Sequence, residues 1–309
     1  MTVLKLESSN TFCESYKFFN THCHAKNLSP YTILDYDRIH AHLVNFMGGD
    51  FGLSDFTEDK LNEYIAFCKA IGNNEITINT KLRHIRAIYN FFADRGYCRP
   101  ITIKLLKTTK TVKDTYTDAE LRLLLKRPNI KDVNFDDYRN WVIVNYLIAT
   151  GNRLSSLVNI RICDLNLSES EVILRHTKNR QQQIIPVAAA LKGILIEYLK
   201  YRKPKNDTDY LFCTWYGEKL SNQGLINAIR KYNRRRGINK TSIHLFRHTF
   251  AKMWILNGGD ILRLQKLLGH KSLEMVKEYV ALFGQDLKKD YDKFNPLSSL
   301  QSKEHIKLS

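Results

Sequence analysis

HLFRHTFAKMWILNGGDILRLQKLLGHKSLEMVKEY, residues 244–279, is the stretch that decides how this chain folds. Its first part predicts a helix, and because residues three and four apart are neighbours on a helix surface, His244, Arg247 and His248 share one face. Apolar residues at core-like spacing mark another face. These residues are Phe246, Phe250, Met253 and Trp254. The predicted helix therefore has one face to bury and one face that carries a guanidinium and two imidazoles.

The remainder of this stretch predicts two further helices. The glycines at 258–259 end the first helix, and Asp260 can cap a second one, because its carboxylate accepts hydrogen bonds from N–H groups at a helix start. The buried stripe of this second helix consists of Ile261, Leu264 and Leu268. Gly269 ends the helix just before a histidine, and Ser272 can cap a third, short helix that carries Tyr279. Packing of the apolar faces leaves the polar groups free to converge.

Three features of the stretch, in this order, resemble the C-terminal signature of the tyrosine recombinases, the phage integrase family. They are the His-x-x-Arg pair of His244 and Arg247, the Leu-Gly-His turn that ends at His270, and Tyr279 one short helix later. The resemblance implies that these four residues are catalytic. His248 is interpreted as a solvated or locally bonded helix residue, and Tyr279 without the other features would be interpreted as a packing residue.

The length and charge of the chain set the class of protein. The 309 residues suffice for two domains, and a hydrophobic fraction of 43% is normal for a folded protein. The net charge of +17 and a pI near 9.5 favour nucleic acid or an anionic membrane surface as partner. The most apolar run, 141–149, is too short to span a membrane, and the N-terminus lacks the apolar core of a signal peptide. We therefore expect a DNA-binding protein with no membrane partner.

The cysteines indicate the compartment. They are widely scattered and include no Cys-x-x-Cys pair that would suggest zinc. The six positions are Cys13, Cys23, Cys68, Cys98, Cys163 and Cys213. We interpret them as reduced thiols of a cytoplasmic protein.

Residues 1–100 predict an all-helical domain. Turn residues separate four periodic segments, which run over about 10–26, 30–46, 57–70 and 77–95. A unit of this kind resembles the core-binding, SAM-like domain that precedes the catalytic domain in the family. The fourth segment presents Lys81, Arg83 and Arg86, which either contact the DNA backbone or form a solvated helix face.

The segment 101–116 predicts a linker between two domains. Lysines recur in it among threonines and apolar residues, at positions Lys104, Lys107, Lys110 and Lys113. Such a linker can follow the phosphate backbone, where each lysine releases condensed counterions, or it can be a charged tether. The two interpretations are compatible.

A catalytic domain is predicted over 117–309, beginning with a capping box at Thr117 and a helix over about 136–149. That helix ends in a Thr-Gly-Asn-Arg sequence, which resembles the first arginine motif of the family and makes Arg153 its catalytic arginine. The sequence departs from the family at Ser156, where an acidic residue usually supports the active-site arginine and histidine. Because serine can still form hydrogen bonds, we expect this departure to tune activity and not to abolish it.

Residues 161–186 predict a small antiparallel sheet inside the otherwise helical domain. Short β-prone runs at 172–174 and 184–185 flank a turn at 176–180. A lysine in a turn is ordinarily a solvated charge, but the family takes its catalytic lysine from this hairpin. The resemblance therefore assigns that role to Lys178, with Arg180 as the near competitor and a candidate DNA contact.

Two helices are predicted over about 188–201 and after residue 221. The second ends in a basic run that either contacts phosphates or forms a solvated helix terminus. This run consists of Lys231, Arg234, Arg235 and Arg236. A final apolar stripe at about 285–297 predicts a tail helix that needs a docking site, which the family finds on a neighbouring protomer. Docking on its own domain is the alternative.

Together, the resemblance implies a mainly α protein built as a two-domain DNA clamp. A helical SAM-like core-binding domain precedes a mixed α/β, mostly α, catalytic domain with a small antiparallel sheet. The phenol of Tyr279 would attack the scissile phosphorus and form a 3'-phosphotyrosyl link, with His244 as base or proton relay. Arg153 and Arg247 would bind the non-bridging oxygens, His270 would hydrogen-bond the phosphate, and the hairpin lysine would protonate the leaving oxygen.

The covalent link conserves the bond energy, so the implied reaction needs no cofactor and no metal. The implied partners are double-stranded DNA with inverted-repeat core sites and further copies of the chain, two on each site and four in synapsis. The absence of an extra arm-binding domain favours an Xer-like recombinase. The alternatives are a type IB topoisomerase-like activity, a non-catalytic DNA-binding protein with this fold, and a metal-dependent nuclease that uses His244, His248 and His270.

Overall fold

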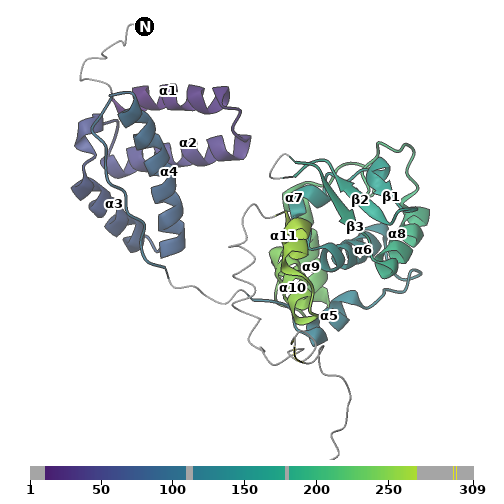
Figure 1. Ribbon diagram of the computed structural model, residues 1–309. Coiled ribbons are helices and arrows are strands. Elements are labelled where there is room, and N and C mark those ends of the chain that lie inside the picture. Colours follow the sequence, from purple (N-terminus) through teal and green to yellow (C-terminus); the bar gives the residue numbers. More distant parts are fainter. Residues whose placement is uncertain (1–10, 109–113, 178–180, 270–294, 296, 298–309) are drawn as a thin grey trace, which may run out of the picture. The chain divides into compact units, whose positions relative to one another are not determined.

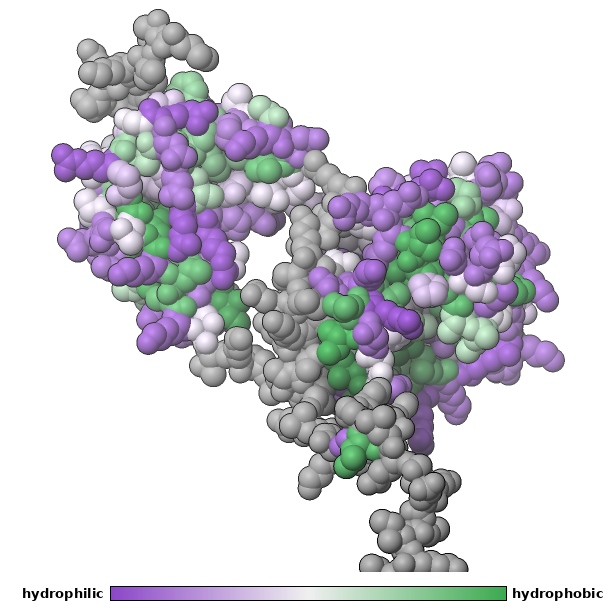
Figure 2. All heavy atoms as spheres, viewed as in Figure 1, coloured by the Kyte–Doolittle hydropathy of each residue, from purple (hydrophilic) through white to green (hydrophobic). Residues whose placement is uncertain are grey.

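The computed structural model describes residues 11–108, 114–177, 181–269, 295 and 297. The chain divides into two compact units, residues 1–111 and 112–309, and each is considered by itself (Figure 1). On the visible face of each unit, hydrophilic residues cover most of the surface and smaller hydrophobic patches lie among them (Figure 2). Among the described residues, no helix is long and apolar enough to cross a membrane.

The first unit is a bundle of four helices, as predicted. Its elements are α1 (Phe12–Ala25), α2 (Pro30–Met47), the short 3-10 helix η1 (Leu53–Asp55), α3 (Glu58–Ala70) and α4 (Glu75–Asp94). Each α-helix begins at a side chain that accepts a backbone N–H three residues later, namely Thr11, Ser29, Thr57 and Asn74. Such caps satisfy N–H groups that have no partner inside the helix. Helices α1 and α2 both pack on α4, which supplies much of the buried core.

The residues that follow α4 pack on the first unit and extend its core. Ile103 is buried there, and Arg86 donates a hydrogen bond to its carbonyl. The amide of Asn79 donates to the carbonyl of Leu106 at 2.9 Å and accepts from its N–H at 2.8 Å. This reciprocal pair holds the chain in an extended path along α4, so residues 101–106 lie on the first unit.

The second unit is built around one helix. Its helices are α5 (Asp118–Leu125), α6 (Phe135–Thr150), α7 (Leu154–Leu157), η2 (Ile162–Asp164), α8 (Ala189–Arg202), α9 (Asn222–Arg235), α10 (His244–Leu256) and α11 (Ile261–Leu268). Helix α6 lies at the centre and contacts α5, α8, α9 and α10 (Figure 1). Most of its residues are buried because neighbours surround it. The apolar run at 141–149 is thus a core helix.

A three-stranded antiparallel sheet with the order β1-β2-β3 lies beside these helices. Its strands are β1 (Leu165–Asn166), β2 (Glu171–Leu174) and β3 (Gln183–Pro186). The β2 and β3 strands form the predicted hairpin, in which Leu174 pairs with Gln183 at the base of the connecting loop. The strand β1 was not predicted, because two residues are too short to show an alternating pattern.

Helices α10 and α11 form the predicted pair and share a small core of their own. Buried Ala251, Leu264 and Leu268 form this core. Asp260 caps α11 by accepting the N–H of Arg263 at 2.7 Å. Two residues predicted to be buried are exposed, Met253 on α10 and Ile261 on α11. Neither of them belongs to the small core that the two helices share.

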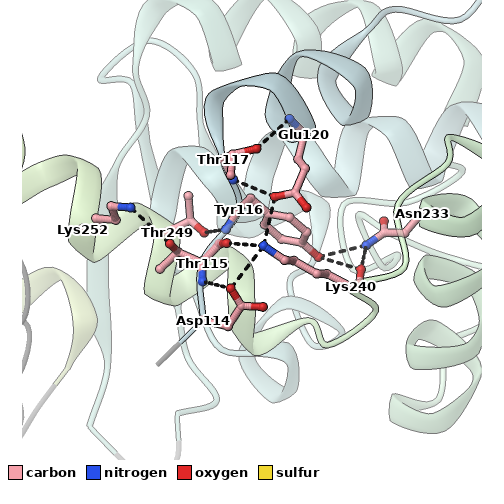
Figure 3. Close-up of polar contacts among 9 residues, drawn as sticks. All are labelled: Asp114, Thr115, Tyr116, Thr117, Glu120, Asn233, Lys240, Thr249 and Lys252. Carbon is pink, nitrogen blue, oxygen red and sulfur yellow. Dashed lines mark hydrogen bonds and ion pairs between the residues drawn. The ribbon is translucent and has the colours of Figure 1, made fainter. Parts of the chain in front are cut away.

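The chain enters the second unit through an anchor, which we define as residues 114–117 (Figure 3). The N–H of Tyr116 donates to the hydroxyl of Thr249 on α10 at 2.9 Å, and its ring lies 4.7 Å from that of Phe246. Its phenol accepts a hydrogen bond from the Asn233 amide at 2.9 Å, and burial raises its pKa. The anchor is therefore fixed to the helix that begins at His244.

Lys240 also holds the anchor, through contacts with one carbonyl and two carboxylates. Its ammonium donates to the carbonyl of Thr115 at 2.9 Å and lies 3.1 Å from the carboxylates of both Asp114 and Glu120. Partial burial opposes the charge, but the two carboxylates outweigh burial and raise the pKa of Lys240. Burial also opposes ionisation of Glu120, yet hydrogen bonds from the Thr117 N–H and from Lys240 lower its pKa.

Replacing Lys240 by methionine is expected to lower the free energy of unfolding by about 1–2 kcal/mol near neutral pH, because the Thr115 carbonyl and two carboxylates lose a charged donor. Because the pKa of Glu120 is lowered, its contribution to the free energy of unfolding is present above about pH 4.3 and is lost as the pH falls through the folded-state pKa. Because the pKa of Lys240 is raised, its contribution to the free energy of unfolding is lost only above about pH 10.4.

Urea unfolding at neutral and acidic pH measures this effect. The control is Lys200→Met, an exposed position on α8 for which the described part of the chain offers no ion pair. A difference between wild type and Lys240→Met that stayed constant down to about pH 3 would contradict the role of Glu120.

Candidate active site

The first part of the site is the loop that follows α6. Helix α6 ends at Thr150, whose hydroxyl donates to the carbonyl of Tyr146 at 2.7 Å. The amide of Asn152 donates to the phenol oxygen of Tyr146, also at 2.7 Å. Both bonds are buried, so they fix the loop against the helix. Arg153 then stands at the N-cap of α7, at the point where the chain leaves the core.

Gly151 makes this loop possible. Its φ of 62° lies in the left-handed region, which favours glycine because it has no Cβ. A Cβ at this position would lie 2.4 Å from Cδ1 of Phe250 and 3.0 Å from Cδ2 of Leu268. The missing side chain therefore lets the loop pack directly against α10 and α11.

Arg247 ties this loop to the end of α11. Its side chain lies on α10 and is buried, with the residue only 6% exposed. Nη1 donates to the carbonyl of Gly151 at 2.9 Å, and Nη2 donates to the carbonyl of Leu268 at 2.6 Å. His244, at the first position of α10, is exposed and lies three residues before it on the same helix. The arginine thus joins two segments that are distant in sequence.

Helix α11 ends in a turn whose carbonyls are held from outside the helix. Gly269 closes the helix with a φ of 59°. Nη2 of Arg153 donates to its carbonyl at 3.3 Å. The amide nitrogen of Gln183, the first residue of β3, donates to the carbonyls of Lys266 at 2.5 Å and Leu267 at 2.8 Å. The hydrogen-bonding groups at the end of the helix are therefore satisfied by side chains.

Four consecutive carbonyls, from residue 266 to residue 269, thus accept bonds from Gln183, Arg247 and Arg153. The end of a helix carries partial negative charge, so two guanidinium groups stabilise it. They come from a loop and from a second helix, and His270 follows directly in the sequence. The structure therefore brings Arg153 and Arg247 together at the predicted Leu-Gly-His turn.

Three of the predicted catalytic residues lie outside the described residues. They are Lys178, His270 and Tyr279. The described residues around Lys178 do fix the base of its hairpin, since the hydroxyl of Thr177 donates to the carbonyl of Gln181 at 2.6 Å. Nε of Arg175 also donates to the Asp164 carboxylate at 2.6 Å. The predicted exchange tail at 285–297 is described only at Asn295 and Leu297.

Ser156, which stands where the family usually has an acidic residue, is buried in α7 and 5% exposed. Its N–H donates to the carbonyl of Arg153 at 3.1 Å. Leu157, the next residue of this short helix, is buried as well. The backbone of Ser156 therefore contributes directly to the turn that presents the arginine.

The predicted DNA contacts of the second unit gather on α9. A hollow of about 490 Å³ is lined by Asn227, Arg230, Lys231, Arg234 and Arg235. Arg235 also pairs with Asp137 at 2.8 Å, and Arg236 lies over the ring of Tyr232 at 3.8 Å. Lys231 and Arg234 are exposed, so they are the more available cations of the four predicted here. Arg180 lies outside the described residues.

The predicted DNA contacts of the first unit differ in environment. Arg83 is exposed, whereas Lys81 lies 2.9 Å from Nε2 of His42, and Arg86 donates to a backbone carbonyl. Lys104 and Lys107 are exposed. The other two lysines of the predicted linker, Lys110 and Lys113, lie outside the described residues. Lys81 and Arg86 thus have structural contacts within their own unit.

Two residues of the site escaped prediction. Arg230 lines the basic hollow one residue before the basic run, and its place on the same face of α9 as Arg234, four residues later, could have been inferred from helical spacing. Gln183 has no comparable signal, because a glutamine in a strand is ordinarily a surface residue and its partners lie more than 80 residues away. Among the described residues, no group of three or more His, Cys, Asp or Glu side chains could hold a metal ion.

Comparison with known proteins identifies the family. Residues 115–285 match the phage integrase family, and residues 11–100 match the phage integrase SAM-like domain. The tyrosine recombinase XerC of Staphylococcus epidermidis is 28% identical over 283 residues, which cover 88% of this chain and 93% of that relative. The tyrosine recombinase XerD of the same species is 27% identical over 234 residues, 73% of this chain and 78% of that relative.

Solved structures share the fold at lower identity. The XerH site-specific recombinase bound to a palindromic difH substrate has a TM-score of 0.72 at 20% identity, covering 91% of this chain and 84% of that one. A lambda integrase tetramer bound to a Holliday junction has a TM-score of 0.68 at 14% identity, covering 87% of this chain and 80% of that one. The helical first unit, the small sheet and the helical second unit are thus those predicted, and the chain belongs to the phage integrase family.

Proposed function

We propose that this protein is a site-specific DNA recombinase that cuts and rejoins DNA strands through a 3'-phosphotyrosyl intermediate. One observation carries the proposal. Arg153 and Arg247 converge on the carbonyls of Leu268 and Gly269, directly before His270 in the sequence. A planar guanidinium binds a phosphate through paired, charge-assisted hydrogen bonds, so two of them at one turn make a site for a phosphodiester.

The proposed step exchanges one phosphate ester for another. The phenol oxygen of Tyr279 forms a bond to the scissile phosphorus, and the bond from phosphorus to the 5'-oxygen breaks. The phenol proton passes to His244, and Lys178 gives a proton to the departing 5'-oxygen. Arg153, Arg247 and His270 bind the non-bridging oxygens, where negative charge develops in the transition state. The number of ester bonds is unchanged, so a second 5'-hydroxyl can reverse the step.

Duplex DNA with inverted-repeat core sites is the proposed substrate. The net charge of +17 and the basic hollow on α9 support binding to a phosphate backbone. Two copies of the chain would occupy each site and four would join two sites. The known lambda integrase tetramer on a Holliday junction supports this arrangement. Free thiols at all six cysteines support a cytoplasmic location.

Formation of a covalent adduct tests the proposal. The purified protein is incubated with sheared genomic DNA of the organism that encodes it, after random nicking, because a nick near the cleavage point lets the short product strand diffuse away and blocks religation. We expect an SDS-resistant protein-DNA adduct whose attached ends share one sequence. Tyr279→Phe is expected to abolish the adduct and to leave DNA binding unchanged, since it removes only the nucleophilic oxygen.

Two outcomes would count against the proposal. Binding without any adduct would favour a non-catalytic DNA-binding protein, and cleavage that vanished with EDTA would favour a metal-dependent nuclease. An adduct retained by Tyr279→Phe would show that another residue is the nucleophile.

Salt dependence tests the basic hollow. Lys231→Ala and Arg234→Ala are each expected to weaken binding to all duplex sequences alike and to reduce the slope of log K against log salt by about 1, because each removes one phosphate contact. Filter binding on a duplex of the recovered sequence and on an unrelated duplex measures both slopes. Lys200→Ala on α8 is the matched control. Unchanged slopes in both variants would place the DNA backbone elsewhere on this unit.

A further inference from the structure

We infer that Gln183 is a positioning residue for the hairpin that carries Lys178, an inference that rests on the proposed function. Gln183 is the first residue of β3 and pairs with Leu174, the last residue of β2, so it stands at the base of the hairpin loop. Lys178 lies five residues before it. A constraint at the base of a short hairpin limits where the tip can go.

The contacts of Gln183 provide that constraint. Its amide nitrogen donates to the carbonyls of both Lys266 and Leu267, at 2.5 and 2.8 Å. A glutamine NH₂ group has two donors, and both are used on one partner segment. Its amide oxygen would lie 3.1 Å from a Cβ at Gly269, so this close approach also depends on glycine at that position. The hairpin is therefore bound to the last turn of α11.

The same turn is held by the arginines. Arg247 binds the carbonyl of Leu268, and Arg153 binds that of Gly269. Gln183 thus connects the hairpin to the segment on which the proposed phosphate-binding groups converge. Without it, strand β3 would keep its pairing with β2, but the hairpin would lose its hydrogen bonds to this segment. The inferred consequence is a misplaced Lys178 ammonium relative to the leaving 5'-oxygen.

Gln183→Met tests the inference, since methionine has a similar length and no donor. Cleavage is measured in a single turnover on two nicked duplexes of the recovered sequence. One has the natural bridging 5'-oxygen, and the other has sulfur in its place. A thiolate leaves without first gaining a proton, because a thiol is a far stronger acid than an alcohol. A defect in protonation is therefore hidden on the sulfur duplex, whereas a general loss of folding is not.

We expect Gln183→Met to cleave the oxygen duplex about 10–100-fold more slowly than wild type, which is a smaller effect than the loss of the general acid itself. On the sulfur duplex, we expect its rate to stay within about 3-fold of the wild-type rate. Lys178→Met gives the reference pattern, with a larger defect on oxygen. Gln182→Met, an exposed neighbour, is the matched control and should behave as wild type on both.

An unchanged rate on the oxygen duplex would overturn the inference, and so would an equal defect of Gln183→Met on both duplexes. These results would leave the proposed function in place, because the wild type would still form its adduct. Failure of the wild type to cleave either duplex would instead remove the proposed function, and the inference with it.

Discussion

Arg247→Lys is expected to slow single-turnover cleavage by about 10²–10³-fold, the usual effect of losing one preorganised donor at a developing charge. Lysine keeps the positive charge but has a single ammonium on a flexible stem. It cannot donate to the carbonyls of Gly151 and Leu268 in the geometry that the guanidinium achieves at 2.9 and 2.6 Å. The variant therefore loses the planar donor and the tie between two loops.

The cleavage rate reports the loss of the planar donor, and the melting temperature reports the loss of the structural tie. An unbonded buried carbonyl costs about 1–3 kcal/mol, so the melting temperature of Arg247→Lys should fall with its activity. Arg263→Lys, an exposed position on α11, is the matched control and should change neither quantity. A rate for Arg247→Lys within about 3-fold of wild type would contradict a role in transition-state binding.

Gly151→Ala is expected to lower the free energy of unfolding of the second unit by about 2–4 kcal/mol, from strained backbone together with overpacking. Its φ of 62° disfavours a side chain, and a Cβ would lie 2.4 Å from a ring atom of Phe250. Either the loop or α10 must move. Because Arg247 donates to the carbonyl of Gly151 and Arg153 follows two residues later, adduct formation should fall as well.

Gly193→Ala provides the control for this substitution. Gly193 lies inside α8, and a Cβ there would meet nothing within 4 Å. Alanine is favoured over glycine in a helix by about 0.5–1 kcal/mol, so this variant should be as stable as wild type or more stable. Equal stability of Gly151→Ala and wild type in urea unfolding would show that the loop can relax, and the proposed crowding would be wrong.

Local signals were sufficient to predict most of the fold. Helix starts at Thr117 and Asp260 were predicted from capping residues and both occur, because a cap depends on residues three positions apart. The hairpin strands were predicted from β-prone runs on either side of a turn. The strand β1 was missed because it exists through its pairing with β2, which a two-residue segment cannot signal by itself.

The arrangement of the site could be predicted only in part. The motif order predicted Arg153 and Arg247 as partners in one site, but it did not reveal that both guanidinium groups donate to backbone carbonyls of the same turn. Those bonds depend on where α11 ends relative to two distant segments. Gln183 was missed for the same reason. Its inferred role depends on the position of its amide in the tertiary structure, which residue type and spacing do not predict.

The linker illustrates how packing changes the interpretation of a charged segment. Lysines at regular intervals suggested a tether or a DNA-following strand between residues 101 and 116. In the structure, Ile103 is buried in the first unit and Tyr116 is buried in the second. The apolar residues that supply this packing lie on either side of the run of lysines, one before Lys104 and one after Lys113. Lys104, which directly follows buried Ile103, and Lys107 are exposed, and their contact with phosphate stays a prediction.

Mass spectrometry of the trapped adduct tests the central claim most directly. The SDS-resistant complex is digested with nuclease and trypsin, and the peptide that carries a residual nucleotide is sequenced. We expect the phosphonucleotide on Tyr279, attached through a 3'-phosphate, in wild type and not in Tyr279→Phe. A nucleotide on any other residue, or attachment through a 5'-phosphate, would contradict the proposed active site.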